Sequence, residues 1–345
     1  RGLGDVYKRQ IDGGAGSDTV RYQQSTSGVI VNLGTSALTI NPATYAVTGM
    51  STVKTIAANT ADDGMSGIDT LINIENIDGS DYNDYLRGGD VVGVRSFMNG
   101  EGGNNTLVGG AGIGIAAYNF TPLSFGGIAA SLLANPSNVV TVQNKFGGSD
   151  TLINIKGLSG THANDTLTGD SGDNQLRGNG GNDTLDGGAG NDWVIYTADP
   201  SSVNANLATG VAQDGWNGAS RLLALGGTDT LLNIENIEGS AYNDTLMGDA
   251  GTNLIKGGLG NDIIDGGAGS DTAVFTATLA QAQFSHNANG SITILTPLDG
   301  IDTVSNIEFA QFSDQTVSLA STTQSSFTKL LGSSGDDRAY AVTTG

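Results

Sequence analysis

Apolar residues recur along this chain at intervals of nine, each embedded in a glycine-rich unit. Residues 178–186 read G-N-G-G-N-D-T-L-D, and residues 187–195 read G-G-A-G-N-D-W-V-I. The eighth residue of each unit is apolar, which predicts a strand of three residues with one side chain turned inward. One such strand buries too little to be stable, but stacked strands gain about 1.5–3 kcal/mol for each buried side chain. The pattern therefore predicts an all-β stack with a single apolar column.

The same unit recurs in a second run over residues 248–274 and in an isolated copy over residues 13–21. The regular spacing of the inward positions argues against low-complexity disorder. These positions are Leu176, Leu185, Val194, Leu246, Ile255 and Ile264. Between the runs, residues 29–33 and 203–207 alternate apolar side chains with a period of two, which predicts half-buried strands there.

A longer period overlays the short one. The phrase D-T-L-x-N-I begins at Asp69, Asp150 and Asp229, at spacings of 81 and 79 residues, and a weaker copy begins at Asp302. The first three copies each lead into a G-[ST]-x-x-N-D-x-L unit. The chain is therefore expected to be a tandem array of about four modules. We expect a partial first module at 11–78, a degenerate module at 79–159, two well-formed modules at 160–238 and 239–315, and the start of a further module or a truncated tail at 316–345.

The first ten residues, RGLGDVYKRQ, have a different character. They resemble the translation of a sequencing adapter, so we expect residues 1–10 to be an artefact and leave them out of fold reasoning. We also expect the natural protein to continue upstream, and an upstream enzymatic or adhesive domain stays possible on this basis.

The charge of the chain is strongly acidic, with 35 Asp and Glu against 14 Lys and Arg. Without residues 1–10 the balance is 34 to 11, a net charge of −23. Nucleic acid is a poor partner for such a chain, because phosphate contacts need Lys and Arg, whereas a metal cation is a natural one. The chain has no cysteine, which excludes disulfides and zinc–thiolate sites, and no apolar run of about 18 residues, which would be needed for a membrane-spanning helix.

The nine-residue unit has the chemistry of a cation site. Glycines at its first, second and fourth positions permit positive φ and a tight turn whose carbonyls point to one side. The aspartate at the sixth position adds a carboxylate to that side. If two units make one coil of eighteen residues, Asp165 stacks on Asp183 and Asn174 on Asp192. In the later run Asp244 stacks on Asp262, and Asn253 stacks on Asp271.

Stacked carboxylates need a cation. At a strand spacing of about 4.8 Å two of them repel by roughly 3–4 kcal/mol at an effective dielectric near 20. Calcium takes 6–8 oxygen ligands in flexible geometry, which paired carboxylates and turn carbonyls from two coils supply. Magnesium is a poorer match, because it keeps its waters and needs a tighter octahedron.

The repeat G-G-x-G-x-D-x-U-x, where U is apolar, resembles that of the RTX, or hemolysin-type calcium-binding, family. The resemblance covers residues 11 to about 315 and is most specific at 160–195 and 239–274. It implies a right-handed parallel β-roll, or β-solenoid, of tandem nonapeptides, with several Ca²⁺ ions between the turns. It also implies export by a type I secretion system, an extracellular or cell-surface location, and folding induced by calcium. The candidate metal ligands are Asp165, Asp170, Asn174, Asp183, Asp192, Asp244, Asp249, Asn253, Asp262, Asp271, Asp18 and Asp84, with the turn glycines Gly178, Gly180, Gly187, Gly257 and Gly266.

Several positions depart from the repeat. Asn174 and Asn253 replace the acidic residue, although Asp170 and Asp249 stand nearby at the second position. Gly114 stands where aspartate is expected, so we expect that turn to bind nothing, and Asn105 occupies the acidic position of residues 100–108. The isolated Asp18 is open between a calcium ligand and a plain turn residue. The aspartates that begin the D-T-L phrase are either ligands or caps at strand ends, and we favour caps.

No catalytic motif stands out in the sequence. H-E-x-x-H, G-x-S-x-G, a P-loop and an EF-hand loop are all absent. His162 and His286 are expected in loops or on the surface, and Trp193 and Trp216 are expected in packing. We therefore expect a non-enzymatic, calcium-binding region of a secreted bacterial protein. The alternatives left open are the C-terminal region of a secreted enzyme (a serralysin-like metalloprotease, a lipase or a polysaccharide-modifying enzyme) and part of a large adhesin or surface layer.

Overall fold

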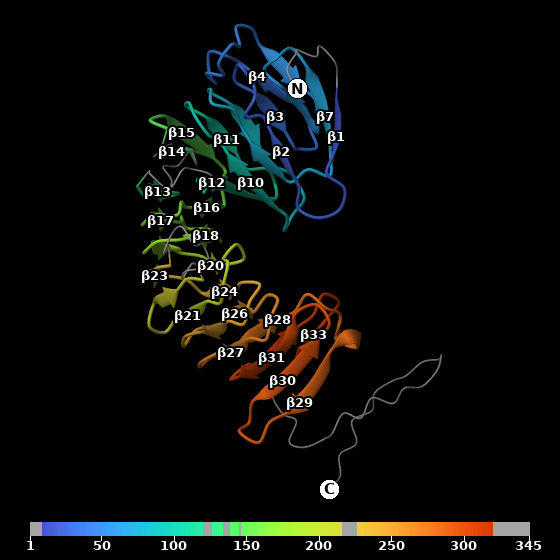
Figure 1. Ribbon diagram of the computed structural model, residues 1–345, viewed down its shortest axis with the longest axis vertical. Coiled ribbons are helices and arrows are strands. Elements are labelled where there is room, and N and C mark those ends of the chain that lie inside the picture. The colour runs from blue at the N-terminus through green and yellow to red at the C-terminus, as the bar shows by residue number, and fades with distance from the viewer. Residues whose placement is uncertain (1–8, 120–125, 134–138, 145, 216–225, 320–345) are drawn as a thin grey trace, which may run out of the picture.

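The computed structural model describes residues 9–119, 126–133, 139–144, 146–215 and 226–319. These residues form 33 strands and one short 3₁₀ helix, η1 (Leu279–Gln281). The strands stack along the long axis of an elongated, curved molecule, with the N-terminal and C-terminal modules at opposite ends (Figure 1). Among the described residues, no helix has the length and apolar character needed to cross a membrane.

One face of the molecule is a single 12-stranded sheet that runs from the first module to the last. We call it the long sheet. Its strands, in spatial order, are β2 (Thr19–Arg21), β8 (Asn76–Asp78), β10 (Arg95–Asn99), β12 (Ile113–Ala117), β16 (Gly157–Ser159), β18 (Gln175–Arg177), β20 (Trp193–Ile195), β24 (Asn236–Glu238), β26 (Leu254–Lys256), β28 (Thr272–Val274), β32 (Phe309–Gln311) and β33 (Thr316–Ser318).

Two shorter sheets follow one another along the molecule and pack on the same core as the long sheet. The N-terminal sheet has the order β1 (Gln10–Asp12), β7 (Ile68–Ile72), β6 (Thr60–Asp62), β3 (Ile30–Asn32), β9 (Tyr85–Arg87), β11 (Thr106–Val108), β15 (Ser149–Ile153) and β14 (Val139–Gln143). The C-terminal sheet has the order β13 (Ala129–Ser131), β17 (Thr166–Thr168), β19 (Thr184–Asp186), β23 (Thr228–Leu232), β22 (Val211–Gln213), β21 (Asn204–Asn206), β25 (Thr245–Met247), β27 (Ile263–Asp265), β31 (Gly300–Ser305), β30 (Ile292–Thr296) and β29 (Gln283–His286).

Consecutive nonapeptides alternate between the two faces, so that two units close one coil. Leu158 pairs in parallel with Leu176 on the long sheet, and Leu167 pairs with Leu185 on the C-terminal sheet, each 18 residues on. The strands are three residues long and only the central side chain is fully buried. The six predicted inward side chains are all at most 1% exposed and belong to one core cluster. The predicted all-β parallel roll of nonapeptides is therefore confirmed.

Three of the longer repeats carry a three-stranded antiparallel meander within the parallel stack, and the second carries one antiparallel pair, β14 with β15. In the third module β21 pairs with β22 and β22 with β23, both antiparallel, while β21 and β23 continue the parallel stack through β25 and β19. Strands β3, β6 and β7 repeat this arrangement in the first module. The segment at 203–207 is half-buried, as its alternation predicted, since Val203 and Ala205 face the core.

The strand predicted at 29–33 is present as β3, but the prediction that it is half-buried is wrong, because all five residues are buried. Val29, Val31 and Leu33 face the main core. The opposite side is covered by a hairpin of β4 (Leu38–Ile40) and β5 (Lys54–Ile56), which forms a second small core with Ile30. A local alternation carries no signal about a distant hairpin that covers its outer face.

The two ends of the chain extend past the residues that the structure describes. Of the segment predicted to be an artefact, residues 1–8 lie outside the described residues, whereas Gln10 begins β1, which pairs with β7. At the other end β33 pairs antiparallel with β32, and the rest of the predicted tail, 320–345, lies outside the described residues, as does Trp216. The module boundaries stay predictions.

Candidate metal centre

The sixth-position residues of successive coils form hydrogen-bonded ladders along both flanks of the roll. On one flank Oδ1 of Asp183 accepts a hydrogen bond from the backbone N–H of Asp165 at 2.7 Å, and Oδ1 of Asp262 accepts one from Asp244 at 2.8 Å. On the other flank Asp192 accepts from Asn174 at 2.7 Å and Asp271 accepts from Asn253 at 2.8 Å. The predicted stacking of these four pairs is confirmed.

The D-T-L-x-N-I-E phrase closes both ladders. Asp229 accepts the N–H of Asp183 at 3.1 Å, and Asp302 accepts that of Asp262 at 2.8 Å. On the opposite flank Glu235 Oε2 accepts the N–H of Asp192 at 2.8 Å, and Glu308 does the same for Asp271 at 2.7 Å. The aspartate and the glutamate of the phrase each end one ladder, so the cap interpretation fits Asp229.

Five sixth-position carboxylates keep one oxygen without a hydrogen bond. Among the described residues, Oδ2 is buried and has no hydrogen-bond partner in Asp18, Asp183, Asp192, Asp262 and Asp271. All five follow the glycine-rich form of the turn. A buried carboxylate oxygen without a donor is costly, because its hydration is lost and not replaced. These oxygens therefore need a cation or a proton.

The three sixth-position aspartates of the G-[ST]-x-x-N-D units differ in this respect. Oδ2 of Asp84, Asp165 and Asp244 accepts the backbone N–H of Ser80, Thr161 and Ser240, respectively. The hydroxyl of the same Ser or Thr also bonds each carboxylate. The side chain that follows the first glycine thus satisfies the aspartate locally.

The first glycine of each unit is required by a close approach and not by its φ. A Cβ on Gly178 or Gly257 would lie 2.1 Å from Oδ2 of Asp183 or Asp262, and on Gly187 or Gly266 it would lie 2.7 Å from that of Asp192 or Asp271. None of these first glycines has positive φ, so the expectation of positive φ at the first position is wrong. The carboxylate folds back over its own turn, and only glycine leaves it room.

The second and fourth positions do adopt the predicted positive φ. Gly188 and Gly190 have φ of 95° and 143°. In the first unit of that run the left-handed residues are Asn179 at 70° and Gly181 at 116°, and the candidate Gly180 stands between them at the third position. Backbone carbonyls of the preceding coil approach these turns. The Asp170 carbonyl oxygen lies 2.3 Å from where a Cβ on Gly188 would be.

The donor set suits calcium if backbone oxygens take part. Among the described residues, no group of three or more His, Asp or Glu side chains converges on one point. A cation here must therefore take carbonyl oxygens as well as carboxylates. Calcium accepts such mixed oxygen shells of 6–8 ligands, so the residues present fit the ion that the repeat implies.

Burial and like charge raise the pKa of the ladder carboxylates. Desolvation first, then the neighbouring Asp229, raises the pKa of Asp183 to about 8. Desolvation first, then Asp302, raises that of Asp262 to about 8. Burial raises the pKa of Asp192 to about 6. Without a cation, ionisation of these groups at neutral pH opposes folding of the stack.

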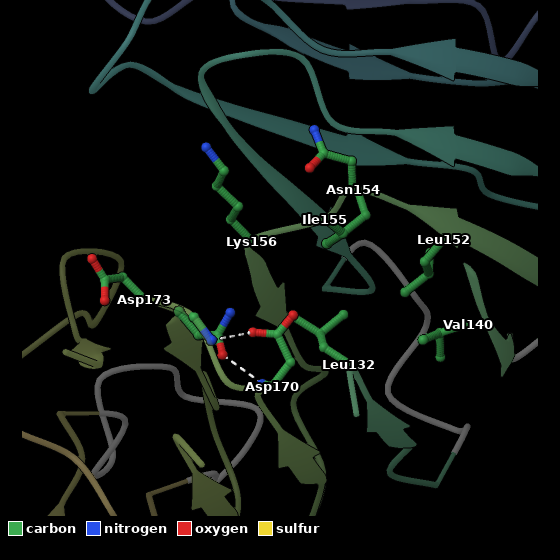
Figure 2. A pocket seen from close by; sticks show the side chains of 10 residues that line it. Leu132, Val140, Leu152, Asn154, Ile155, Lys156, Asp170 and Asp173 are labelled. Atoms are coloured by element: carbon green, nitrogen blue, oxygen red, sulfur yellow. Dashed lines mark hydrogen bonds between the residues drawn. The ribbon is translucent and has the colours of Figure 1, made fainter. Parts of the chain in front are cut away.

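The asparagine turns have a different geometry. Oδ1 of Asn174 accepts the backbone N–H of Asp170 at 2.6 Å, and Oδ1 of Asp170 accepts that of Gly172 at 2.8 Å. Asp249 and Asn253 repeat both contacts. The Asn174 turn borders a cavity of about 300 Å³, in which Lys156 and Asn154 lie across from Asp170 (Figure 2).

The degenerate module replaces the ladder charges by neutral or basic groups. Asn105 donates its backbone N–H and its Nδ2–H to Oδ1 of Asp150, at 3.2 and 2.9 Å. On the other flank Gly114 stands at the sixth position and Lys156 replaces the glutamate of the phrase. The N–H of Lys156 donates to the Gly114 carbonyl at 2.9 Å, as the N–H of Glu235 does to the Asp192 carbonyl at 3.2 Å, so the backbone contact is kept while the carboxylates are lost. The two departures occur together on neighbouring coils.

Sequence reasoning missed an outer ladder at the fifth position. The N–H of Asn182 donates to Oδ1 of Asn164, and that of Asn261 to Oδ1 of Asn243, both at 2.9 Å. The recurring N-D pair was the available signal. His162 lies in the turn after β16 and His286 in β29, and Trp193 lies on β20, partly buried.

Comparison with known proteins identifies the repeat. The RTX calcium-binding nonapeptide repeat matches the chain in four copies, over residues 96–115, 159–194 and 238–273. No curated protein matches the chain. Among solved structures, the extracellular lipase LipA from Serratia marcescens is 15% identical, with a TM-score of 0.16, over 70% of this chain and 42% of the lipase. The chain thus spans about two fifths of that lipase's length, and a likeness at this level carries no argument about activity. The chain carries RTX calcium-binding repeats, as their sequence resemblance implied.

Proposed function

We propose that this chain binds several Ca²⁺ ions in the turns between its coils and that binding drives the roll to fold outside the cell. The observation that carries this proposal is the set of five buried Oδ2 atoms without a hydrogen-bond donor. Among the sixth-position aspartates of the described residues, such atoms occur only in the glycine-rich turns, where the first glycine leaves room beside the carboxylate. The RTX repeats over 159–194 and 238–273 support the same assignment.

The proposed ligands fall into two groups. Asp183, Asp192, Asp262 and Asp271 supply carboxylate oxygens, and Asp18 does so in the first module. Turn carbonyls around Gly178, Gly187, Gly257 and Gly266, with Gly180, complete the shells. The remaining candidates shape the turns. Three aspartates accept hydrogen bonds from a Ser or Thr of their own turn: Asp84, Asp165 and Asp244. Asn174 and Asn253 accept the backbone N–H groups of Asp170 and Asp249, respectively.

The proposed mechanism couples folding to calcium. In a compartment poor in calcium, like-charged buried carboxylates and the entropy of the glycine-rich turns keep the chain loose. At extracellular calcium each filled site stabilises the roll by RT ln(1 + [Ca²⁺]/Kd). This behaviour suits export of a loose chain by a type I secretion system, and we place the protein outside the cell or on its surface. The chain would serve as a structural module of a larger protein, either a secreted enzyme or an adhesin.

Calorimetric titration of the metal-free chain with Ca²⁺, followed in parallel by far-ultraviolet circular dichroism, tests the proposal. We expect several ions to bind together with a gain of β structure. Asp183→Asn, Asp192→Asn, Asp262→Asn and Asp271→Asn keep the rung acceptor but replace the free oxygen by an amide, so each should lower the number of ions bound.

The matched controls are Asp165→Asn and Asp244→Asn, whose second oxygen already has a protein donor. These variants should keep the stoichiometry of the wild type and lose only stability. A chain that keeps the same β content and binds no Ca²⁺ after EDTA treatment and dialysis would overturn the proposal.

A further inference from the structure

In each module an aromatic residue follows the long-sheet strand that precedes the inserted segment of the longer repeat. Tyr22, Tyr118, Tyr196 and Phe275 come directly after β2, β12, β20 and β28. The Tyr196 hydroxyl donates to Oδ2 of Asp229 at 3.2 Å, and the Tyr22 hydroxyl donates to Oδ2 of Asp69 at the same distance. Tyr118 interacts with Asp150, the corresponding aspartate of the second module. In two modules, therefore, a phenol donates to the second oxygen of the aspartate that begins the D-T-L phrase, and in a third a phenol interacts with that aspartate.

The last module lacks this donor. Phe275 is buried and stacks on Phe312 with ring centroids 5.2 Å apart. It has no hydroxyl to give to Asp302, which is the corresponding aspartate. Asp302 is only 1% exposed and keeps the rung bond from the Asp262 N–H to its Oδ1. In the described part of the chain it accepts no other hydrogen bond.

The neighbouring acidic residue does not share this property. Asp299 accepts the backbone N–H groups of Thr276 and Ala277 and the hydroxyl of Thr296. Protein donors therefore balance its charge. Asp302 and Asp262 remain as two buried carboxylates on consecutive rungs, each with one oxygen that no protein donor reaches, and Oδ2 of Asp262 is among the five such buried oxygens.

We propose that Asp302 is an additional calcium ligand of the last module, whereas Tyr196 holds its counterpart Asp229 as a cap. This inference rests on the proposed calcium binding. An added carboxylate raises the charge of the ligand set, and calcium affinity rises with the charge of its ligands. The Asp262 site should therefore bind Ca²⁺ more tightly than the Asp183 site.

The test uses two variants of the full chain, one that adds a phenol hydroxyl and one that removes it. Phe275→Tyr should donate to Asp302 and weaken calcium binding at the Asp262 site about tenfold, the effect of one interaction to a charged group. Tyr196→Phe should free Asp229 and tighten the Asp183 site by a similar factor. Calorimetric titration of Phe275→Tyr in an Asp183→Asn background reads the Asp262 site without the Asp183 site. Titration of Tyr196→Phe in an Asp262→Asn background reads the Asp183 site without the Asp262 site.

Two further variants keep the test decisive. Asp302→Asn should weaken the last site without any change in packing, which covers the case in which Tyr does not fit at 275. Phe284→Tyr is the control, because it adds a hydroxyl to the same aromatic cluster on a ring that packs against Phe312. If the wild type binds Ca²⁺ and Phe275→Tyr, Tyr196→Phe and Asp302→Asn all leave the affinities unchanged, this inference is wrong and the proposed function stands. If the wild type binds no Ca²⁺, the proposed function itself fails.

Discussion

The module at 79–159 and the module at 160–238 build the same coils with opposite solutions to buried charge. In the first, the side chain of Asn105 donates to Asp150 on the next rung. In the second, Asp183 stands at the place of Asn105 and faces Asp229 with one oxygen unpaired. The strands pair in the same register in both modules. The coil geometry thus comes from strand pairing and the apolar column, and the unpaired carboxylates are where we propose that cations bind.

The pKa values follow the same division. Burial raises the pKa of Asp150 to about 6, and hydrogen bonds from Asn144 and Asn105 limit the rise. Burial raises the pKa of Asp229 to about 8, with further increases from the charges of Asp214 and Asp199. At pH 7 the degenerate module therefore keeps a satisfied carboxylate, whereas the other one holds carboxylates that resist ionisation.

Removal of calcium should separate the two modules most strongly. In EDTA at pH 7 we expect residues 160–315 to lose protection against amide hydrogen exchange, because their buried carboxylates then repel one another. Residues 79–159 should keep most of theirs. Hydrogen exchange with mass spectrometry on the full chain, with and without Ca²⁺, measures this difference. Equal loss in both regions would mean that the degenerate module also depends on the ion.

A single substitution should make the degenerate module behave like its neighbour. Asn105→Asp removes the amide donor to Asp150 and places a second carboxylate on the next rung, at a cost of about 3 kcal/mol without calcium. We expect a lower thermal midpoint in EDTA and a partial recovery on addition of Ca²⁺. The reciprocal change, Asp183→Asn, should raise the midpoint in EDTA. Thermal unfolding of both variants, in EDTA and in Ca²⁺, tests whether these two residues determine the dependence of each module on calcium. A midpoint for Asn105→Asp in EDTA equal to that of the wild type would contradict this prediction.

The parts of the site that sequence could predict are those set by a fixed spacing. Asp165 and Asp183 are always one coil of 18 residues apart, so their contact follows from the period alone. The contacts at the end of each ladder span an inserted meander of variable length. Asp183 reaches Asp229 across 46 residues, and Asp262 reaches Asp302 across 40. No period specifies these partners. The hydrogen bond from the Tyr196 hydroxyl to Asp229, and the lack of a tyrosine beside Asp302, were therefore not predicted.

The glycines show a second limit of sequence reasoning. A G-G-x-G pattern correctly predicts left-handed turn residues, but it does not distinguish a glycine needed for φ from one needed for space. Gly178 belongs to the second kind, because its hydrogen faces the carboxylate of Asp183. That carboxylate folds back over its own turn to reach the N–H of Asp165, which is a property of the stacked coils. A single unit read by itself does not contain this information.

The first glycines provide the finest test of the contrast between the modules. A Cβ on Gly178 would lie 2.1 Å from Oδ2 of Asp183, and a Cβ on Gly100 would lie 2.3 Å from Nδ2 of Asn105. Gly178→Ala and Gly100→Ala should each cost about 1–3 kcal/mol through overpacking. Only Gly178→Ala should also weaken calcium binding, because it displaces a proposed ligand. Gly172→Ala is the control, since its nearest neighbour would be 3.4 Å away. Chemical unfolding and calcium titration of the three variants distinguish a shared packing role from a role in binding, and equal calcium affinities for all three would leave only packing for these glycines.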